Sequence, residues 1–206
     1  RLLERPLRGN QSFFLFGPRG TGKTSWAREK IPEALCIDLL ETTAFIDLSA
    51  RPNRLEEMIP PGFSDWVIID EVQKVPAILD EVHWCLENTK TKFILCGSSA
   101  RKLRHGAANL LGGRAWRFEL FPLTTKELEK PQLSRILNHG LIPKHYLEET
   151  PERSLKSYVL DYIEEEIRSE ALTRNVPAFA RFLDAVALTH GQLINYANIA
   201  RDCGVD

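Results

Sequence analysis

The sequence predicts an α/β fold in which five parallel strands are flanked by helices. Short apolar runs alternate with helical patterns across residues 12–121, which is the order expected of successive βαβ units. A glycine-rich loop follows the first run, and two acidic residues close the third. Because the carboxyl ends of parallel strands meet at one edge of a sheet, these two features are expected to face each other across a ligand site.

The expected strands are short runs that are rich in apolar residues. They cover residues 12–16, 35–39, 67–70, 92–97 and 116–121. Between the third and fourth runs, apolar residues at helical spacing form one stripe, made of Ile78, Leu79, Val82, Cys85 and Leu86. We expect this stripe to pack into the core rather than to line a ligand site.

The glycine-rich loop fits the phosphate-binding pattern G-x-x-x-x-G-K-[ST]. Its residues, with the serine that follows, are Gly17, Pro18, Arg19, Gly20, Thr21, Gly22, Lys23, Thr24 and Ser25. Backbone N–H groups of such a loop wrap a di- or triphosphate, and a helix over residues 23–30 adds the positive end of its dipole. Lys23 is expected to reach the outer phosphates, and Thr24 to ligate Mg²⁺. The other interpretation, an ordinary glycine turn, leaves most of these constrained positions unexplained.

The two acids follow a continuous apolar run over residues 66–69, as expected of a strand buried on both faces. Asp70 is placed to hold a metal ion through a water molecule, and Glu71 to polarise an attacking water as a general base. The alternative is that both acids are solvated residues that simply end a strand. The glycine-rich loop upstream favours the metal-binding interpretation, because the two features complement each other chemically.

Composition excludes some classes of partner. The chain has 206 residues, 43% of them hydrophobic, and a net charge of −1, so its overall charge gives no reason for non-specific binding to nucleic acid or membranes. No apolar run approaches the length of about 20 residues that a membrane span needs.

The four cysteines, Cys36, Cys85, Cys96 and Cys203, form no C-x-x-C pair. This pattern favours buried free thiols and a cytoplasmic location.

Four further stretches give the chain a family resemblance. They are residues 67–73 with Pro76 after them, residues 95–100, Gly113 with Arg114, and residues 118–123. Together with the two nucleotide motifs, they make the chain resemble the AAA+ superfamily of P-loop ATPases. Within it, the chain is similar to prokaryotic predicted ATPases that carry a winged helix and a nuclease-like C-terminal domain. The resemblance covers nearly the whole chain and lacks only the nuclease-like part.

The resemblance implies a P-loop NTPase sheet with strand order 5-1-4-3-2. In that order the strand over residues 92–97 inserts between the P-loop strand and the Asp70 strand, which makes Ser98 the candidate sensor of the γ-phosphate. Ser99 is the alternative sensor, and either serine would also suit a helix N-cap. Arg114 corresponds to an arginine finger that completes the active site of a neighbouring subunit in a homo-oligomer. The other interpretation of Arg114 is a solvated surface residue.

Beyond the sheet the resemblance implies two helical parts. We expect an ATPase core over residues 1–124, a helical lid over residues 125–175, and an incomplete winged helix-turn-helix over residues 176–206. The turn that ends at Pro143 would cover the adenine, although His139 stands where relatives carry a glycine. The alternative, equally good, is that this turn only packs the lid onto the sheet. Ala200 and Gly204 have the spacing of the first helix and turn of a DNA-binding motif. A helical pair that only packs the lid is the alternative.

These residues lead to two functional hypotheses. In the first, the chain binds ATP with Mg²⁺ and hydrolyses it, and the catalytic groups are Lys23, Glu71, Ser98 and Arg114. Hydrolysis then drives a conformational switch that is coupled to DNA or to a nuclease-like domain. In the second, the chain is a regulatory module that holds nucleotide and exchanges it slowly. Glu71 favours the first hypothesis, because a pure binder needs no general base.

Overall fold

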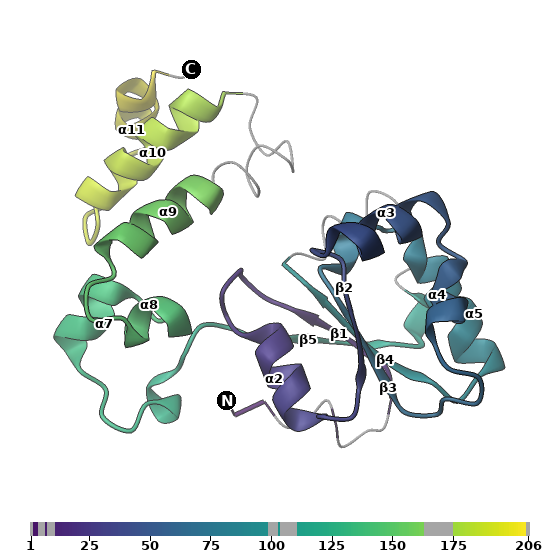
Figure 1. The fold of residues 1–206 in the computed structure, drawn as a ribbon. Helices are drawn as coiled ribbons and strands as arrows, with labels where there is room; N and C mark the ends of the chain where they lie inside the picture. The colour runs from purple at the N-terminus through teal and green to yellow at the C-terminus, as the bar shows by residue number, and fades with distance from the viewer. Residues whose placement is uncertain are drawn as a thin grey trace. The chain divides into compact units, whose positions relative to one another are not determined.

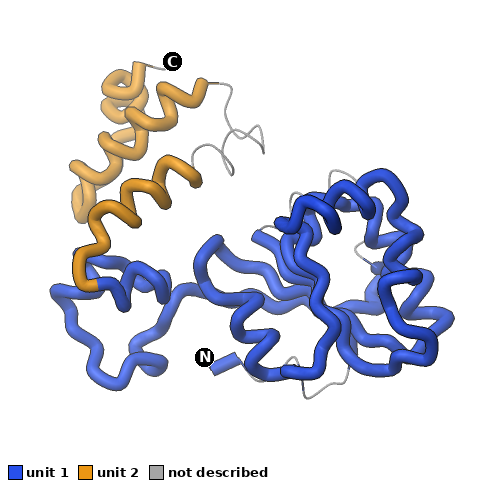
Figure 2. Tube along the Cα trace, in the orientation of Figure 1, with its two compact units in different colours: residues 1–148 blue, residues 149–206 orange. Residues whose placement is uncertain are grey.

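The structure is a computed structural model of the whole chain, and it describes residues 2–3, 7, 11–98, 103, 111–162 and 175–204. The chain forms two compact units, residues 1–148 and 149–206 (Figure 2). The sheet and the glycine-rich loop belong to the first unit (Figure 1). The predicted domain boundaries after residues 124 and 175 stay predictions.

The first unit is built on a five-stranded parallel sheet. Its strands are β1 (Phe13–Phe16), β2 (Leu35–Asp38), β3 (Trp66–Asp70), β4 (Lys92–Gly97) and β5 (Trp116–Glu119). Their order is β2-β3-β4-β1-β5, which is the predicted order 5-1-4-3-2 counted from the other edge. The fold class and the strand order are therefore confirmed.

The pairing register brings the functional strand ends to one edge. Phe16, the last residue of β1, lies opposite Gly97 of β4 and Glu119 of β5. On the other side of β4, Ile69 lies opposite Leu95, so that Asp70 ends β3 near the start of the glycine-rich loop. Sequence segments that are far apart thus meet because the strands between them are parallel and aligned.

Helices cover both faces of the sheet (Figure 1). Helix α2 (Lys23–Lys30) packs Trp26 and Ala27 on one face. Helices α3 (Thr42–Ala50), α4 (Arg54–Met58) and α5 (Ile78–Asn88) cover the other face. Successive residues of β1 alternate between the two cores, as a strand requires. The predicted stripe on α5 is core, since Ile78, Leu79, Val82 and Cys85 are buried.

The expectation of buried cysteines is only partly right. Cys85, Cys96 and Cys203 are buried, whereas Cys36 is exposed. Cys36 lies on β2, an edge strand, and its side chain falls on neither of the two covered cores. Burial, with a smaller contribution from Glu56 and Glu81, raises the pKa of Cys85 to about 11, so this thiol stays protonated at neutral pH.

Two short helices follow the sheet within the first unit. They are α7 (Leu133–His139) and α8 (Pro143–Leu147). Elsewhere in the unit, three-residue 3-10 turns cover Val72–Lys74, Leu111–Gly113 and Thr125–Glu127. Arg135 fastens α7 to α8, because its guanidinium donates to the carbonyl oxygens of Tyr146 at 2.7 Å and Glu148 at 2.8 Å. The same guanidinium lies over the Tyr146 ring, which adds a cation–π contact.

His145 makes the stability of this helical pair depend on pH. Its side chain is buried, and burial lowers its pKa below the ordinary value. The unfolded chain therefore takes up a proton more readily than the folded chain once the pH falls past about 6.5, and stability decreases with acid over that range. We expect His145→Gln to flatten this dependence, measured as the urea midpoint at pH 7.5 and at pH 5.0. An equal acid loss in both proteins would contradict the assignment.

The second unit contains α9 (Glu152–Tyr162), α10 (Val176–Leu188) and α11 (Tyr196–Cys203). Asparagine side chains cap α10 and α11, since Asn175 accepts from the Ala178 N–H and Asn195 from the Asn198 N–H. Arg181 of α10 donates twice to the carbonyl oxygen at the end of α11. Within the described ranges, no helix is long and apolar enough to cross a lipid bilayer.

Candidate functional site

The glycine-rich loop joins the end of β1 to the start of α2, and its first glycine has no substitute. Gly17 has a φ of +153°, and a Cβ added to it would lie 2.1 Å from the carbonyl oxygen of Leu120. The segment after β5 therefore passes directly against the loop, where the Leu120 N–H donates to the Phe16 oxygen at 2.7 Å. Only a residue without a side chain lets the loop begin here.

Lys23 is held inside the loop. Its side chain is only 6% exposed, and its Nζ donates to the carbonyl oxygens of Gly17 at 2.8 Å and Pro18 at 3.1 Å. Thr21 is also buried and donates its hydroxyl to the Pro18 oxygen at 2.9 Å. The ammonium group thus lies against the start of the loop, where it would neutralise phosphate charge if a polyphosphate were bound.

A hydroxyl and a carboxylate meet at the start of α2. The Thr24 Oγ1 donates to Asp70 Oδ2 at 2.5 Å, and Asp70 Oδ1 accepts the Glu71 N–H at 3.0 Å. Both groups offer hard oxygen atoms, the ligands that Mg²⁺ prefers, and they lie beside a loop shaped for phosphate. The donor set therefore fits a magnesium ion, which Thr24 and Asp70 would hold.

The second acid sits in an unusual backbone conformation. Glu71 has φ 54° and ψ 41°, a left-handed conformation that costs a non-glycine residue about 1 to 2 kcal/mol. Its carboxylate accepts a hydrogen bond from Gln73, which also donates to the Ser98 hydroxyl at 3.3 Å. The structure thus joins the two predicted residues Glu71 and Ser98 through a residue to which the sequence alone gave no role.

The remaining predicted contacts surround this centre. Pro18, Gly20 and Ser25 are exposed and Arg19 is half-buried. Ser99, the alternative sensor, lies outside the described residues. Pro143 begins α8, and the residue before it, Ile142, lies against the loop, because a Cβ on Gly20 would be 3.1 Å from the Ile142 Cγ2.

Comparison with known proteins shows the family of this chain. The family described as AAA domain matches residues 9–129, which is more than half of the chain. The chain belongs to the AAA domain family. A second family, a domain of unknown function (DUF8612), matches residues 130–206. No curated protein matches the sequence.

A solved structure with the same fold aligns with this AAA protein over nearly its whole length. The Walker-type ATPase PABY2304 of Pyrococcus abyssi aligns with a TM-score of 0.57 at 16% identity, covering 98% of this chain and 87% of that chain. The ORC2 protein of Aeropyrum pernix in its ADP form aligns with a TM-score of 0.36 at 15% identity, covering 97% of this chain and 64% of that chain. The Pyrococcus protein has the same fold as this chain. The AAA family consists of ATPase domains of the P-loop type.

Arg114 lies away from the phosphate loop of its own AAA domain. It precedes β5, at the amino edge of the sheet, and its guanidinium pairs with Glu87 of α5 at 2.6 Å. The Arg114 side chain is 44% exposed. The structure therefore does not bring Arg114 together with Lys23 and Glu71 in one chain, which leaves a role in a neighbouring subunit as the prediction.

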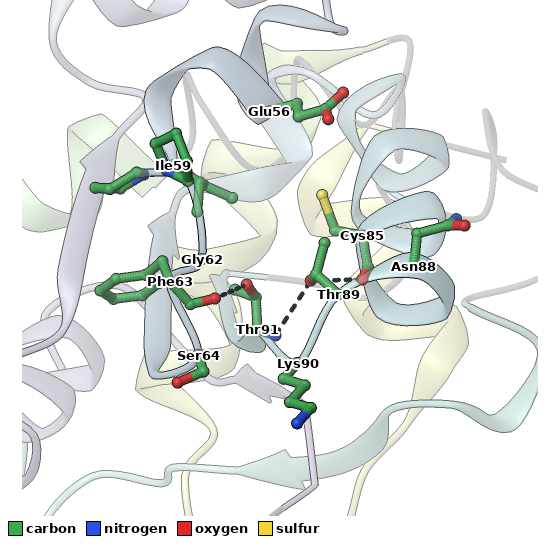
Figure 3. A pocket seen from close by; sticks show the side chains of 12 residues that line it. Glu56, Ile59, Gly62, Phe63, Ser64, Cys85, Asn88, Thr89, Lys90 and Thr91 are labelled. Atoms are coloured by element: carbon green, nitrogen blue, oxygen red, sulfur yellow. Dashed lines mark hydrogen bonds between the residues drawn. The ribbon is translucent and has the colours of Figure 1, made fainter.

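The AAA domain also has a cavity of about 420 Å³ at the amino edge of the sheet (Figure 3). It lies between the segment before β3 and the end of α5, and its walls include Glu56, Phe63, Cys85, Thr89 and Thr91. The threonine hydroxyls donate to the carbonyl oxygens of Cys85 and Phe63.

In the described part of the chain, the one buried side-chain N or O atom without a hydrogen-bond partner is Gln73 Oε1, which belongs to the nucleotide site.

Proposed function

We propose that this chain binds ATP with Mg²⁺ at the carboxyl edge of its sheet and hydrolyses it. The observation that carries the proposal is the 2.5 Å contact between the Thr24 hydroxyl and the Asp70 carboxylate beside the phosphate loop. The contact joins two hard oxygen ligands at the start of the helix that Lys23 begins, and Glu71 follows Asp70 directly. These are the groups that phosphoryl transfer to water needs.

Each residue has one task in this reaction. Lys23 leaves its carbonyl partners to hold the outer phosphates. Thr24 and Asp70 would hold a Mg²⁺ ion, which would supply positive charge to the phosphates. Glu71 accepts a proton as the water oxygen forms its bond to the γ-phosphorus and the bond to the β-phosphate oxygen breaks. The Ser98 hydroxyl donates to the γ-phosphate and so stabilises the charge on its oxygens.

Hydrolysis is proposed to drive a conformational switch in the helical part of the chain. The contact between Gly20 and Ile142 supports this, because Ile142 leads into α8 and Pro143 is proposed to lie over the adenine. In the subtype that the sequence resembles, the moving part would act on DNA through a winged helix, or on a nuclease-like domain. We also propose a homo-oligomer, in which Arg114 reaches the site of a neighbouring subunit.

The nucleotide site is tested by removing the charge of one lysine. Lys23→Met should weaken binding of Mg²⁺ and ATP by roughly 10- to 100-fold, because a hydrogen bond between an ammonium group and a phosphate is lost. Titration calorimetry measures the affinity. Lys30→Met is the matched control, since Lys30 is exposed at the other end of the same helix. Absence of any heat on titration into the unaltered protein would overturn the proposal.

A further inference from the structure

Gln73 contacts two residues of the site, but the proposed reaction gives it no task. It lies two residues after Glu71, on the 3-10 turn Val72–Lys74 that follows β3. Its Nε2 donates to Glu71 Oε2 and, at 3.3 Å, to Ser98 Oγ. One carboxamide therefore contacts both the acid that follows β3 and the serine that follows β4.

The orientation of this carboxamide follows from the charges around it. A carboxylate accepts hydrogen bonds and repels a carbonyl oxygen, so the NH₂ group and not Oε1 must face Glu71. The NH₂ group has two protons, and the two contacts use both. Because the Ser98 oxygen accepts one of them, the Ser98 hydroxyl proton is directed elsewhere and is available to a phosphate oxygen.

The carbonyl end of Gln73 lies close against the strand beside it. Gln73 Oε1 is buried without a hydrogen-bond partner, and a Cβ added to Gly97 would lie 2.6 Å from it. Gly97 has an ordinary strand conformation, so its lack of a side chain is explained by this close approach and not by backbone strain. The last residue of β4 thus makes the space that the Gln73 carboxamide fills.

We propose that Gln73 is a positioning residue that couples the general base to the γ-phosphate sensor, an inference that rests on the proposed function. When Ser98 donates to the γ-phosphate, the Gln73 carboxamide is held by Ser98 and in turn holds the Glu71 carboxylate against the attacking water. Gln73 does not contact the reacting atoms. Gly97 is part of the same device, because any larger residue displaces the carboxamide.

The first test separates hydrogen bonding from bulk. Gln73→Met keeps the length of the side chain and removes both donors, so we expect kcat for ATP to fall about 10- to 100-fold. The affinity for Mg²⁺ and ATP should stay within about twofold, because phosphate binding depends on the loop and Lys23. Gln132→Met is the matched control on an exposed glutamine, and its kcat should equal that of the unaltered protein. A kcat for Gln73→Met within twofold of that value overturns the proposal, and so does an equal loss of affinity.

The second test asks whether Gly97 acts through Gln73. Gly97→Ala should lower kcat about as much as Gln73→Ala, since the new Cβ displaces only the end of a flexible side chain. The double variant should be no slower than either single variant, because the Cβ then meets only the Phe16 ring, at 3.5 Å, which is an ordinary van der Waals contact. Multiplied losses in the double variant would mean that the two residues act independently, which contradicts the proposal.

A third readout distinguishes failure of this inference from failure of the proposed function. The free energy of unfolding, measured in urea, detects the contact between Gly97 and Gln73 without any need for hydrolysis. It is measured for the unaltered protein, for Gly97→Ala, for Gln73→Ala and for the double variant. Gly97→Ala should destabilise the unaltered protein more than it destabilises Gln73→Ala. If the unaltered protein hydrolyses no ATP, the proposed function and the coupling both fail, whereas hydrolysis that is unaffected by Gln73→Met removes the coupling alone.

Discussion

Glu71→Gln should almost abolish turnover while Mg²⁺ and ATP still bind with unaltered affinity. The new amide has the same shape, and its carbonyl oxygen still accepts the hydrogen bond that Gln73 donates to Glu71. An amide, however, takes no proton from water, so the contribution of the general base is lost, and kcat should fall about 10²- to 10⁴-fold. Phosphate release measures the rate, and calorimetry measures the affinity.

The control for this variant is an acid that is remote from the site. Glu29→Gln changes an exposed residue on α2 and should leave both values unchanged. Unchanged phosphate release by Glu71→Gln would remove Glu71 from its catalytic role. Single-turnover release much slower than seconds in the unaltered protein, with tightly held product, would instead support the regulatory module that exchanges nucleotide slowly.

Glu71 also explains why the site is built on a strained residue. Its left-handed backbone turns the chain sharply after Asp70, so that two adjacent acids serve different partners. Asp70 contacts Thr24 and the Glu71 N–H, while the Glu71 carboxylate reaches Gln73. We propose that the conformational cost is compensated by this separation, which gives the proposed metal ligand and the proposed base different partners.

The fold was predictable because its determinants are local. The continuous apolar runs that became β1, β3 and β4 are buried throughout or nearly so, which is the pattern of central strands in a parallel sheet. The edge strands β2 and β5 carry more exposed residues, and the exposure of Cys36 could not be read from its own neighbours. It depends on which strand has no partner on one side, a property of the whole sheet.

The part of the site that escaped prediction depends on pairing between distant segments. Gln73 and Gly97 are adjacent only because β3 and β4 pair in parallel with a fixed register. In the sequence each has an ordinary explanation, as a polar residue after a strand and as a glycine at a strand end. Their relationship appears only when the space left by a missing Cβ is compared with the position of a carboxamide oxygen.

Arg114→Ala should lower the rate of hydrolysis about 10³- to 10⁵-fold, the effect of removing an arginine finger. In its own chain the guanidinium pairs with Glu87 at the edge of the sheet opposite the phosphate loop, so the arginine-finger prediction requires it to act on a neighbouring subunit. Arg117→Ala is the matched control, because Arg117 is equally exposed, at 44%, and pairs with Glu119. Its activity should remain within about twofold of the unaltered protein.

Mixing two inactive variants decides between action within a chain and action between chains. In an equal mixture of Arg114→Ala and Glu71→Gln, some interfaces combine the intact Glu71 of one subunit with the intact Arg114 of the other. Activity should therefore reappear on mixing and rise with protein concentration as oligomers form. If Arg114 served its own chain, every site in the mixture would lack one of the two groups and no activity would return. If Arg114 were a solvated surface residue, Arg114→Ala would be active before mixing, since breaking one exposed ion pair costs a domain less than about 1 kcal/mol.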